Sequence, residues 1–295
     1  MSDTLLTQGW DYHAGESERL AAELEAAAAA PVEDADLVQF ARLAVHTIGE
    51  HLDDWPRARR LAEQVLAGRR PEAATAKAWA HCSIAGRLAG DPGGAAAAEL
   101  AWLGAAPDFR AALIEARFML VAALVGCGRA GEAVELFRAA LALARSLGEA
   151  APARAVAVAS NNLGYDLVEE PTRTPDEDAV MRLAADAALE FWRKCGTWQH
   201  EELALALTAR VATLLGEPNR ALADIDQALA VIAASGDDAP ADAAILRVVR
   251  SAALGLKGDA AGQAKALAEA DRAAAALDDA DARAFYDEQR AWIVG

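Results

Sequence analysis

Apolar residues recur at three- and four-residue steps along most of the chain, and no run alternates apolar and polar side chains in the manner of a β-strand. Steps of this length place apolar side chains on one face of an α-helix. The pattern predicts five apolar helical segments, each followed by a turn: 74–90, 110–128, 154–170, 203–216 and 241–258. We therefore expect an all-α fold.

A second amphipathic segment follows each turn of Gly, Asp or Pro, and these segments resemble one another. The stretch GRAGEAVELFRAALA at 128–142 has relatives in DDWPRARRLAEQVLA at 53–67 and GEPNRALADIDQALA at 216–230. Further copies begin at positions 14, 90, 174 and 258. From position 53 onward the turn recurs at intervals of about 37 to 46 residues, which indicates a helical repeat. One hairpin cannot bury both of its apolar faces, so the repeats predict about seven stacked hairpins.

The order of small and large residues in these repeats resembles that of the tetratricopeptide repeat (TPR) family. The second helix of that family carries a small, a bulky and a small residue, matched here by Ala133, Phe137 and Ala140 and again by Ala221, Ile225 and Ala228. In the first helix, Trp79 matches the favoured large residue, and Leu163 and Gly164 match a Leu-Gly pair.

The resemblance implies a right-handed α-solenoid of antiparallel helix hairpins, a TPR-like superhelix. We expect residues 1–295 to form one such domain. The charged segment 278–295 is expected to be a C-terminal capping helix, because repeat arrays need a polar end for solubility.

Composition and charge restrict the partners. Alanine is abundant, and aromatic residues make up only 5% of the chain, which favours closely packed helices. The net charge of −17 should repel nucleic acid and anionic lipid, so neither is expected as a partner. No apolar run approaches the ~18 residues that a membrane helix needs. The start of the chain does not resemble a secretory signal, and we expect a cytoplasmic protein.

The sequence offers little sign of catalytic or metal-binding chemistry. His46 and His51 are five residues apart, which misses the three- or four-residue step that brings two side chains together on an α-helix. No HExxH or CxxC motif accompanies them, and no glycine-rich phosphate loop or nucleophile elbow is present. We therefore expect no catalytic residues, no metal ligands and no cofactor. Cys82, Cys127 and Cys195 are expected to be reduced thiols.

The TPR resemblance implies that the first helices line a concave groove that binds a peptide segment or helix of a partner protein. Counting back from each turn gives the side chains expected to point into that groove: Lys77, Arg87, Phe118, Asn161, Tyr165 and Arg210. Cations there could pair with a peptide carboxylate, and Asn161 could bind a peptide backbone. The sequence thus favours a non-enzymatic interaction scaffold. A regulatory sensor of a small signal molecule or peptide is the main alternative, an enzyme is a more distant one, and self-association stays open.

Overall fold

Helices joined by short turns make up the chain in a computed structural model that describes residues 3–148, 150–237 and 239–294. The chain divides into two compact units, Met1–Leu147 and Gly148–Gly295. The described residues contain fifteen α-helices, one π-helix and no strand, so the predicted all-α class is confirmed. Among the described residues, no helix is long and apolar enough to cross a membrane.

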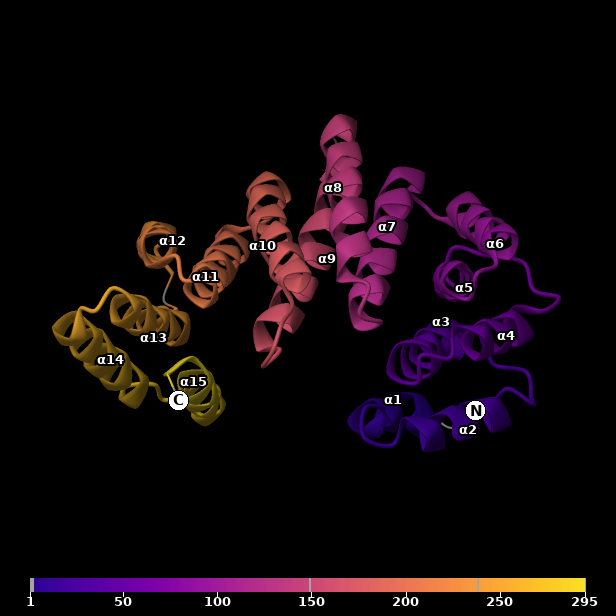
Figure 1. Ribbon diagram of the computed structural model, residues 1–295, viewed down its shortest axis with the longest axis horizontal. Helices are drawn as coiled ribbons and strands as arrows, with labels where there is room; N and C mark the ends of the chain where they lie inside the picture. The colour runs from indigo at the N-terminus through magenta and orange to yellow at the C-terminus, as the bar shows by residue number, and fades with distance from the viewer. Residues whose placement is uncertain (1–2, 149, 238, 295) are drawn as a thin grey trace. The chain divides into compact units, whose positions relative to one another are not determined.

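The first unit contains four successive hairpins (Figure 1). Its elements are α1 (Asp3–Tyr12), α2 (Ser17–Ala27), α3 (Asp34–Ala44), the π-helix η1 (Val45–His51), α4 (Trp55–Leu66), α5 (Lys77–Leu88), α6 (Pro92–Ala105), α7 (Phe109–Gly126) and α8 (Ala130–Leu147).

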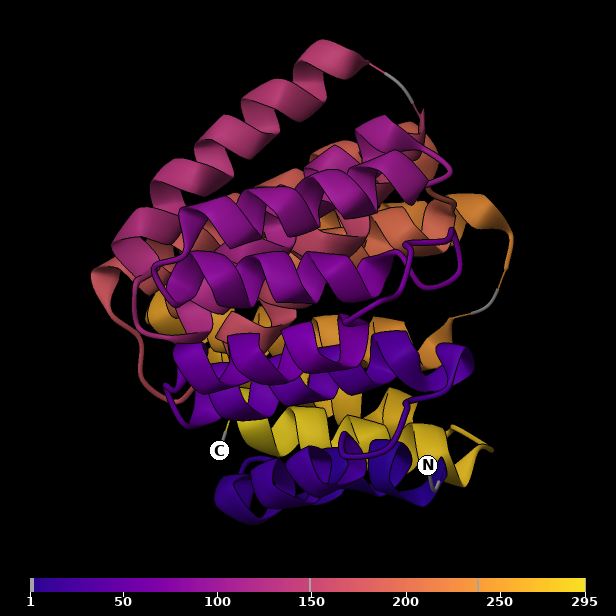
Figure 2. The same ribbon diagram turned by 90° about the vertical axis from the view of Figure 1, so that its right-hand side faces the viewer.

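The second unit contains three hairpins and a final helix that packs on α13 and α14 (Figures 1 and 2). Its elements are α9 (Ala150–Glu169), α10 (Pro175–Cys195), α11 (Trp198–Leu214), α12 (Pro218–Ser235), α13 (Pro240–Leu256), α14 (Ala260–Ala275) and α15 (Ala280–Val294). The predicted hairpin repeat and C-terminal helix are thus present. A single domain and a right-handed superhelix stay predictions.

Left-handed glycines close the repeated turn. The first helix of four hairpins is followed by a glycine with φ between 72° and 79°, namely Gly90, Gly128, Gly216 and Gly258. The next N–H then donates to a carbonyl five residues earlier, as Asp91 does to Gly86 and Glu217 does to Ala212, each at 2.8 Å. Glycine takes this conformation without a Cβ penalty and satisfies the last carbonyls of the helix. The repeated glycine of the sequence is therefore a helix stop.

The second hairpin departs from this rule by one residue. Asp53 takes the left-handed place with φ 52°, and the N–H of Asp54 donates to the carbonyl of Ile48 at 3.0 Å, six residues back. The additional residue is accommodated in η1, where hydrogen bonds run from i to i+5. Gly49 makes this helix fit, because a Cβ there would lie only 2.5 Å from the Trp55 ring.

Small residues pack the helices closely, as the sequence predicts. Ala133, Phe137 and Ala140 are buried on α8, and so are their counterparts Ala221, Ile225 and Ala228 on α12. A Cβ on Gly164 of α9 would lie 2.8 Å from Leu207 of α11. The small residues therefore set the distance between neighbouring helices.

Candidate functional site

The six residues predicted to face a groove divide between the two units. Lys77, Arg87 and Phe118 belong to the first unit, on α5 and α7, and the other three belong to the second, on α9 and α11. Whether all six line one groove therefore stays a prediction. Within each unit, the structure does show which of them meet.

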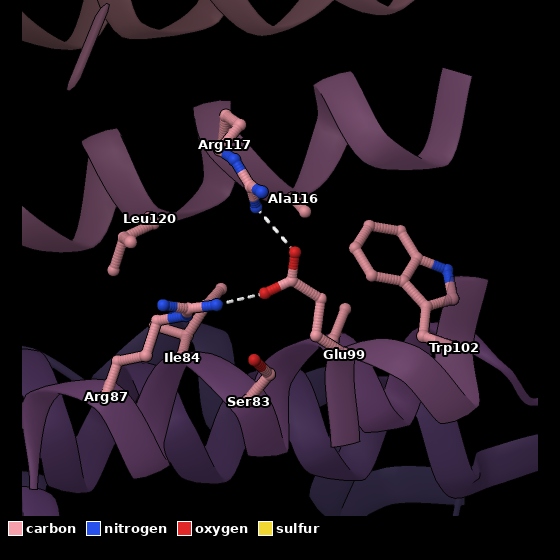
Figure 3. A pocket seen from close by; sticks show the side chains of 9 residues that line it. Ser83, Ile84, Arg87, Glu99, Trp102, Ala116, Arg117 and Leu120 are labelled. Atoms are coloured by element: carbon pink, nitrogen blue, oxygen red, sulfur yellow. Dashed lines mark hydrogen bonds and ion pairs between the residues drawn. The ribbon is translucent and has the colours of Figure 1, made fainter. Parts of the chain in front are cut away.

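Lys77 and Arg87 of α5 both pair with acids of neighbouring helices. Lys77 forms an ion pair with Glu115 of α7 near the surface, where such a pair contributes ~0–1 kcal/mol. Arg87 pairs with Glu99 of α6, and Arg117 of α7 reaches the other oxygen of that carboxylate at 2.6 Å (Figure 3). Burial alone would raise the pKa of Glu99, but the hydrogen bonds from Arg117 and Arg87 hold it below its usual value.

The space around this Arg87–Glu99–Arg117 network is too small for a ligand. The side chains in Figure 3 enclose a cavity of about 10 Å³, roughly the volume that one water-sized sphere occupies. The network thus joins α5, α6 and α7 through paired charges, and we interpret Arg87 as a residue that connects helices.

Phe118 lies in the interior of the first unit. Its side chain is only 2% exposed, and it packs edge-on against Phe137 of α8, with ring centroids 4.9 Å apart and an interplanar angle of 82°. An aromatic pair of this geometry stabilises the core. The Phe118 ring therefore belongs to the core of the first unit.

Asn161, Tyr165 and Arg210 lie on two neighbouring helices of the second unit. Asn161 and Tyr165 are one turn apart on α9. The Tyr165 hydroxyl donates to the carbonyl of Leu203 on α11 at 3.2 Å, and the Arg210 guanidinium lies 5.7 Å from the Tyr165 ring centroid. The structure therefore brings Tyr165 and Arg210 together, as a cation–π pair at the outer limit of such contacts.

Two exposed apolar side chains lie at helical spacing from these residues. Val158 is three residues before Asn161 on α9 and 39% exposed, and Leu203 is seven residues before Arg210 on α11 and 43% exposed. We call this set of five, Val158, Asn161, Tyr165, Leu203 and Arg210, the α9–α11 face. Exposed apolar residues beside a charged group are a common feature of binding surfaces.

Burial shifts the ionisation of the groups around this face. It lowers the pKa of Arg210, an effect that Tyr165 and Glu169 oppose, and it raises the pKa of Tyr165 to about 12. Glu202 of α11 is 1% exposed, and burial, with a smaller effect from Asp242, raises its pKa to about 8. Burial thus favours the neutral form of the Glu202 carboxyl.

A cluster of three histidines in the first unit was not expected from the sequence. The Nε2 atoms of His46 and His51 lie 3.2 Å apart, and the His13 ring centroid is within 5.0 Å of both of their rings. The expectation that His46 and His51 lie on different helix faces is therefore wrong. That expectation assumed an α-helix. In the π-helix η1 the turn is wider, so residues five apart lie on the same face of the helix.

The rings of this cluster are held by hydrogen bonds. The Nδ1 of His13 donates to the carbonyl of Trp10 at 2.6 Å, and the Nδ1 of His46 donates to the carboxylate of Glu50 at 2.6 Å. Because a carbonyl and a carboxylate only accept, both rings carry a proton on Nδ1, and the Nε2 of each presents a lone pair. In the sequence, the one sign of this histidine cluster is that the second hairpin is one residue longer before its turn than the other hairpins.

Comparisons with known proteins find structural neighbours of low sequence identity. No protein-family model matches the chain, and no curated protein shows significant similarity to it. The solved structure of BtubC (BKLC) from P. vanneervenii is 18% identical, with 88% of this chain and 92% of that chain covered and a TM-score of 0.45. A tetratricopeptide repeat protein from Parabacteroides merdae is 13% identical, with 99% and 98% covered and a TM-score of 0.34. The order of small and large residues in the repeats is the feature that this chain shares with tetratricopeptide repeat proteins.

Proposed function

We propose that the chain is a non-enzymatic interaction scaffold whose α9–α11 face binds a peptide segment or helix of a partner protein. The observation that carries the proposal is the arrangement of this face. Exposed Val158 and Leu203 lie beside Asn161 and the Tyr165–Arg210 pair on two adjacent helices. A peptide that covers them would bury apolar area while it meets a fixed set of polar groups.

Each polar group suggests one feature of the peptide. The Asn161 amide offers both a donor and an acceptor, which suits a peptide backbone. Arg210 is only 6% exposed, so its guanidinium suits a single carboxylate that reaches into the face. Because the chain carries a net charge of −17, a strongly acidic peptide would be repelled. We therefore expect a segment with one or two apolar anchors and a single carboxylate.

Selection from a displayed library of random peptides tests this proposal. Peptides enriched on the immobilised full chain should share an apolar residue near an acidic one. Leu203→Ala, with circular dichroism to confirm its helicity, should weaken their binding about fivefold or more, the effect of ~1 kcal/mol. Arg272→Ala, an exposed arginine of α14 in the same unit, is the matched control and should bind as wild type does. Equal binding to wild type and to Leu203→Ala would reject the face.

We further propose a cytoplasmic location. Cys82, Cys127 and Cys195 are free thiols in the described structure, which suits a reducing compartment. Self-association of the chain stays a prediction.

A further inference from the structure

We propose that His13, His46 and His51 form a binding site for a divalent transition-metal ion of the Zn²⁺ type. The expectation of no metal ligands rested largely on the spacing of His46 and His51, and η1 removes that objection. Each of the three residues offers one nitrogen ligand, and these atoms all lie within 4.8 Å of one another.

The distances fit a first-row metal. Zn–N bonds of ~2.0–2.1 Å in a tetrahedral site place two ligand nitrogens about 3.3 Å apart. The Nε2 atoms of His46 and His51 lie 3.2 Å apart, at this spacing already. In the metal-free chain, this contact is a hydrogen bond to the Nε2 lone pair of His46. On metal binding, His51 would carry its proton on Nδ1 and turn its own Nε2 lone pair toward the ion.

The groups behind the ligands are those that metal sites use. A ligating histidine usually donates its other N–H to a carboxylate or a backbone carbonyl, which fixes the tautomer and the ring orientation. His46 has Glu50 in this place, and His13 has the Trp10 carbonyl. Two of the three imidazoles are thus oriented with Nε2 available before any ion is bound.

The backbone of the second hairpin is specialised at this point. π-helices are rare and often occur at functional sites. Here the π-turn runs from Val45 to His51 and is the element that aligns His46 with His51. Gly49, the one residue type that fits under the Trp55 ring, permits it. The extra residue in η1 therefore does more than turn the chain, because it also brings the rings of His46 and His51 together.

The surroundings allow a bound cation with an open position. The Trp10 ring lies 5.3 Å from both His13 and His46, and the Arg42 guanidinium stacks on Trp10 at 4.7 Å. The Glu50 carboxylate, which accepts from His46, offsets the positive charge of the Arg42 guanidinium near the site. Because His51 is exposed, water can reach the ion, and three protein ligands leave a fourth position for it. The ion would also connect the end of α1 to η1.

Calorimetric titration of the untagged full chain with ZnCl₂ tests the site. Wild type should bind one ion per chain with a dissociation constant in the micromolar range or tighter. His13→Gln and His51→Gln, on separate elements, should each weaken binding at least tenfold, and Glu50→Gln should weaken it about tenfold through the ring of His46. His200→Gln, in the second unit, removes a histidine elsewhere and should leave binding unchanged.

The competing outcomes are distinct. No heat of binding for wild type, or equal binding to wild type and to both histidine variants, would overturn the proposal. Circular dichroism of each variant shows that a loss of binding is not a loss of fold. The titration contains no peptide, so its result is independent of the α9–α11 face.

Discussion

The Nε2 of His51 lies 3.2 Å from the Nε2 of His46, although five residues separate them in the chain. In an α-helix that spacing would turn the two rings away from each other. The π-turn from Val45 to His51 brings them together, and the closing hydrogen bond from Asp54 to Ile48 shows where the additional residue lies. One residue beyond the repeat length thus creates a side-chain cluster inside an otherwise regular hairpin.

Metal binding should stabilise the first unit. An ion that binds only the folded chain stabilises it by about 2.7 kcal/mol when its concentration is a hundred times the dissociation constant. Thermal unfolding followed by circular dichroism should show a rise in Tm with Zn²⁺ and little with Mg²⁺, which prefers oxygen ligands. The rise should be absent in His51→Gln and present in His200→Gln. A Zn²⁺ effect of equal size in both variants would contradict the site.

Gly49→Ala should disturb η1. The new methyl group would lie 2.5 Å from the Trp55 ring, which is buried between η1 and α4, so the backbone has to shift. Overpacking of this kind costs about 1–3 kcal/mol in the free energy of unfolding, measured by urea denaturation. Zn²⁺ affinity should fall as well. Gly104→Ala on α6, where an added Cβ meets nothing, is the control and should be neutral or stabilise by up to ~1 kcal/mol. Equal effects of the two substitutions would show that Gly49 has no special role.

Glu202 should make the chain less stable as the pH rises. Burial raises the pKa of this carboxyl to about 8 in the folded chain, from an ordinary value of 4.5. Between these two values the folded state holds a proton that the unfolded state has released. Ionisation of Glu202 therefore costs no stability below about pH 4.5. Between there and pH 8, it lowers the free energy of unfolding by up to ~1.4 kcal/mol per pH unit.

Urea denaturation across this pH range, compared between wild type and Glu202→Gln, isolates that contribution. The glutamine is neutral at every pH, so the variant should lose the slope and gain on wild type as the pH rises. Asp242→Asn separates the second carboxyl, whose pKa burial also raises. Parallel pH profiles for wild type and Glu202→Gln would show that Glu202 is ionised in the folded chain.

Phe118→Ala should cost about 3–5 kcal/mol of stability, because it opens a cavity beside Phe137 in the core of the first unit. Phe109→Ala is a matched control on the same helix, α7, since Phe109 is exposed and its truncation should change stability by less than ~0.5 kcal/mol. Chemical denaturation measures both. A small loss for Phe118→Ala would mean that its ring faces solvent, as a groove residue would.

The hairpins were predictable because their signals are local. Helical periodicity, left-handed glycines such as Gly90 and small residues such as Ala133 each act within a few residues of the chain. The site residues depend on finer detail. An error of one position on a helix turns a side chain by about 100°, enough to place Phe118 in the core and not in a groove. The partner of Arg87, Glu99, comes from the following helix.

The histidine cluster depended on two facts that the sequence conceals. The backbone of residues 45–51 is a π-helix, a choice that periodicity does not reveal because the apolar pattern differs by a single residue. His13 then joins His46 and His51 only because α1 packs against α3 and α2 packs against η1. Contacts between separate elements of this kind require the folded structure.

Photo-crosslinking tests the α9–α11 face most directly. A photoreactive amino acid placed at Val158, which is exposed beside Asn161, should form a covalent adduct with a peptide selected on the wild-type chain. The same group placed at Arg272 of α14 should form none. Adducts at position 158 that excess unmodified peptide suppresses would support a scaffold that binds peptide through this face, whereas equal labelling at both positions, or labelling at 272 alone, would contradict it.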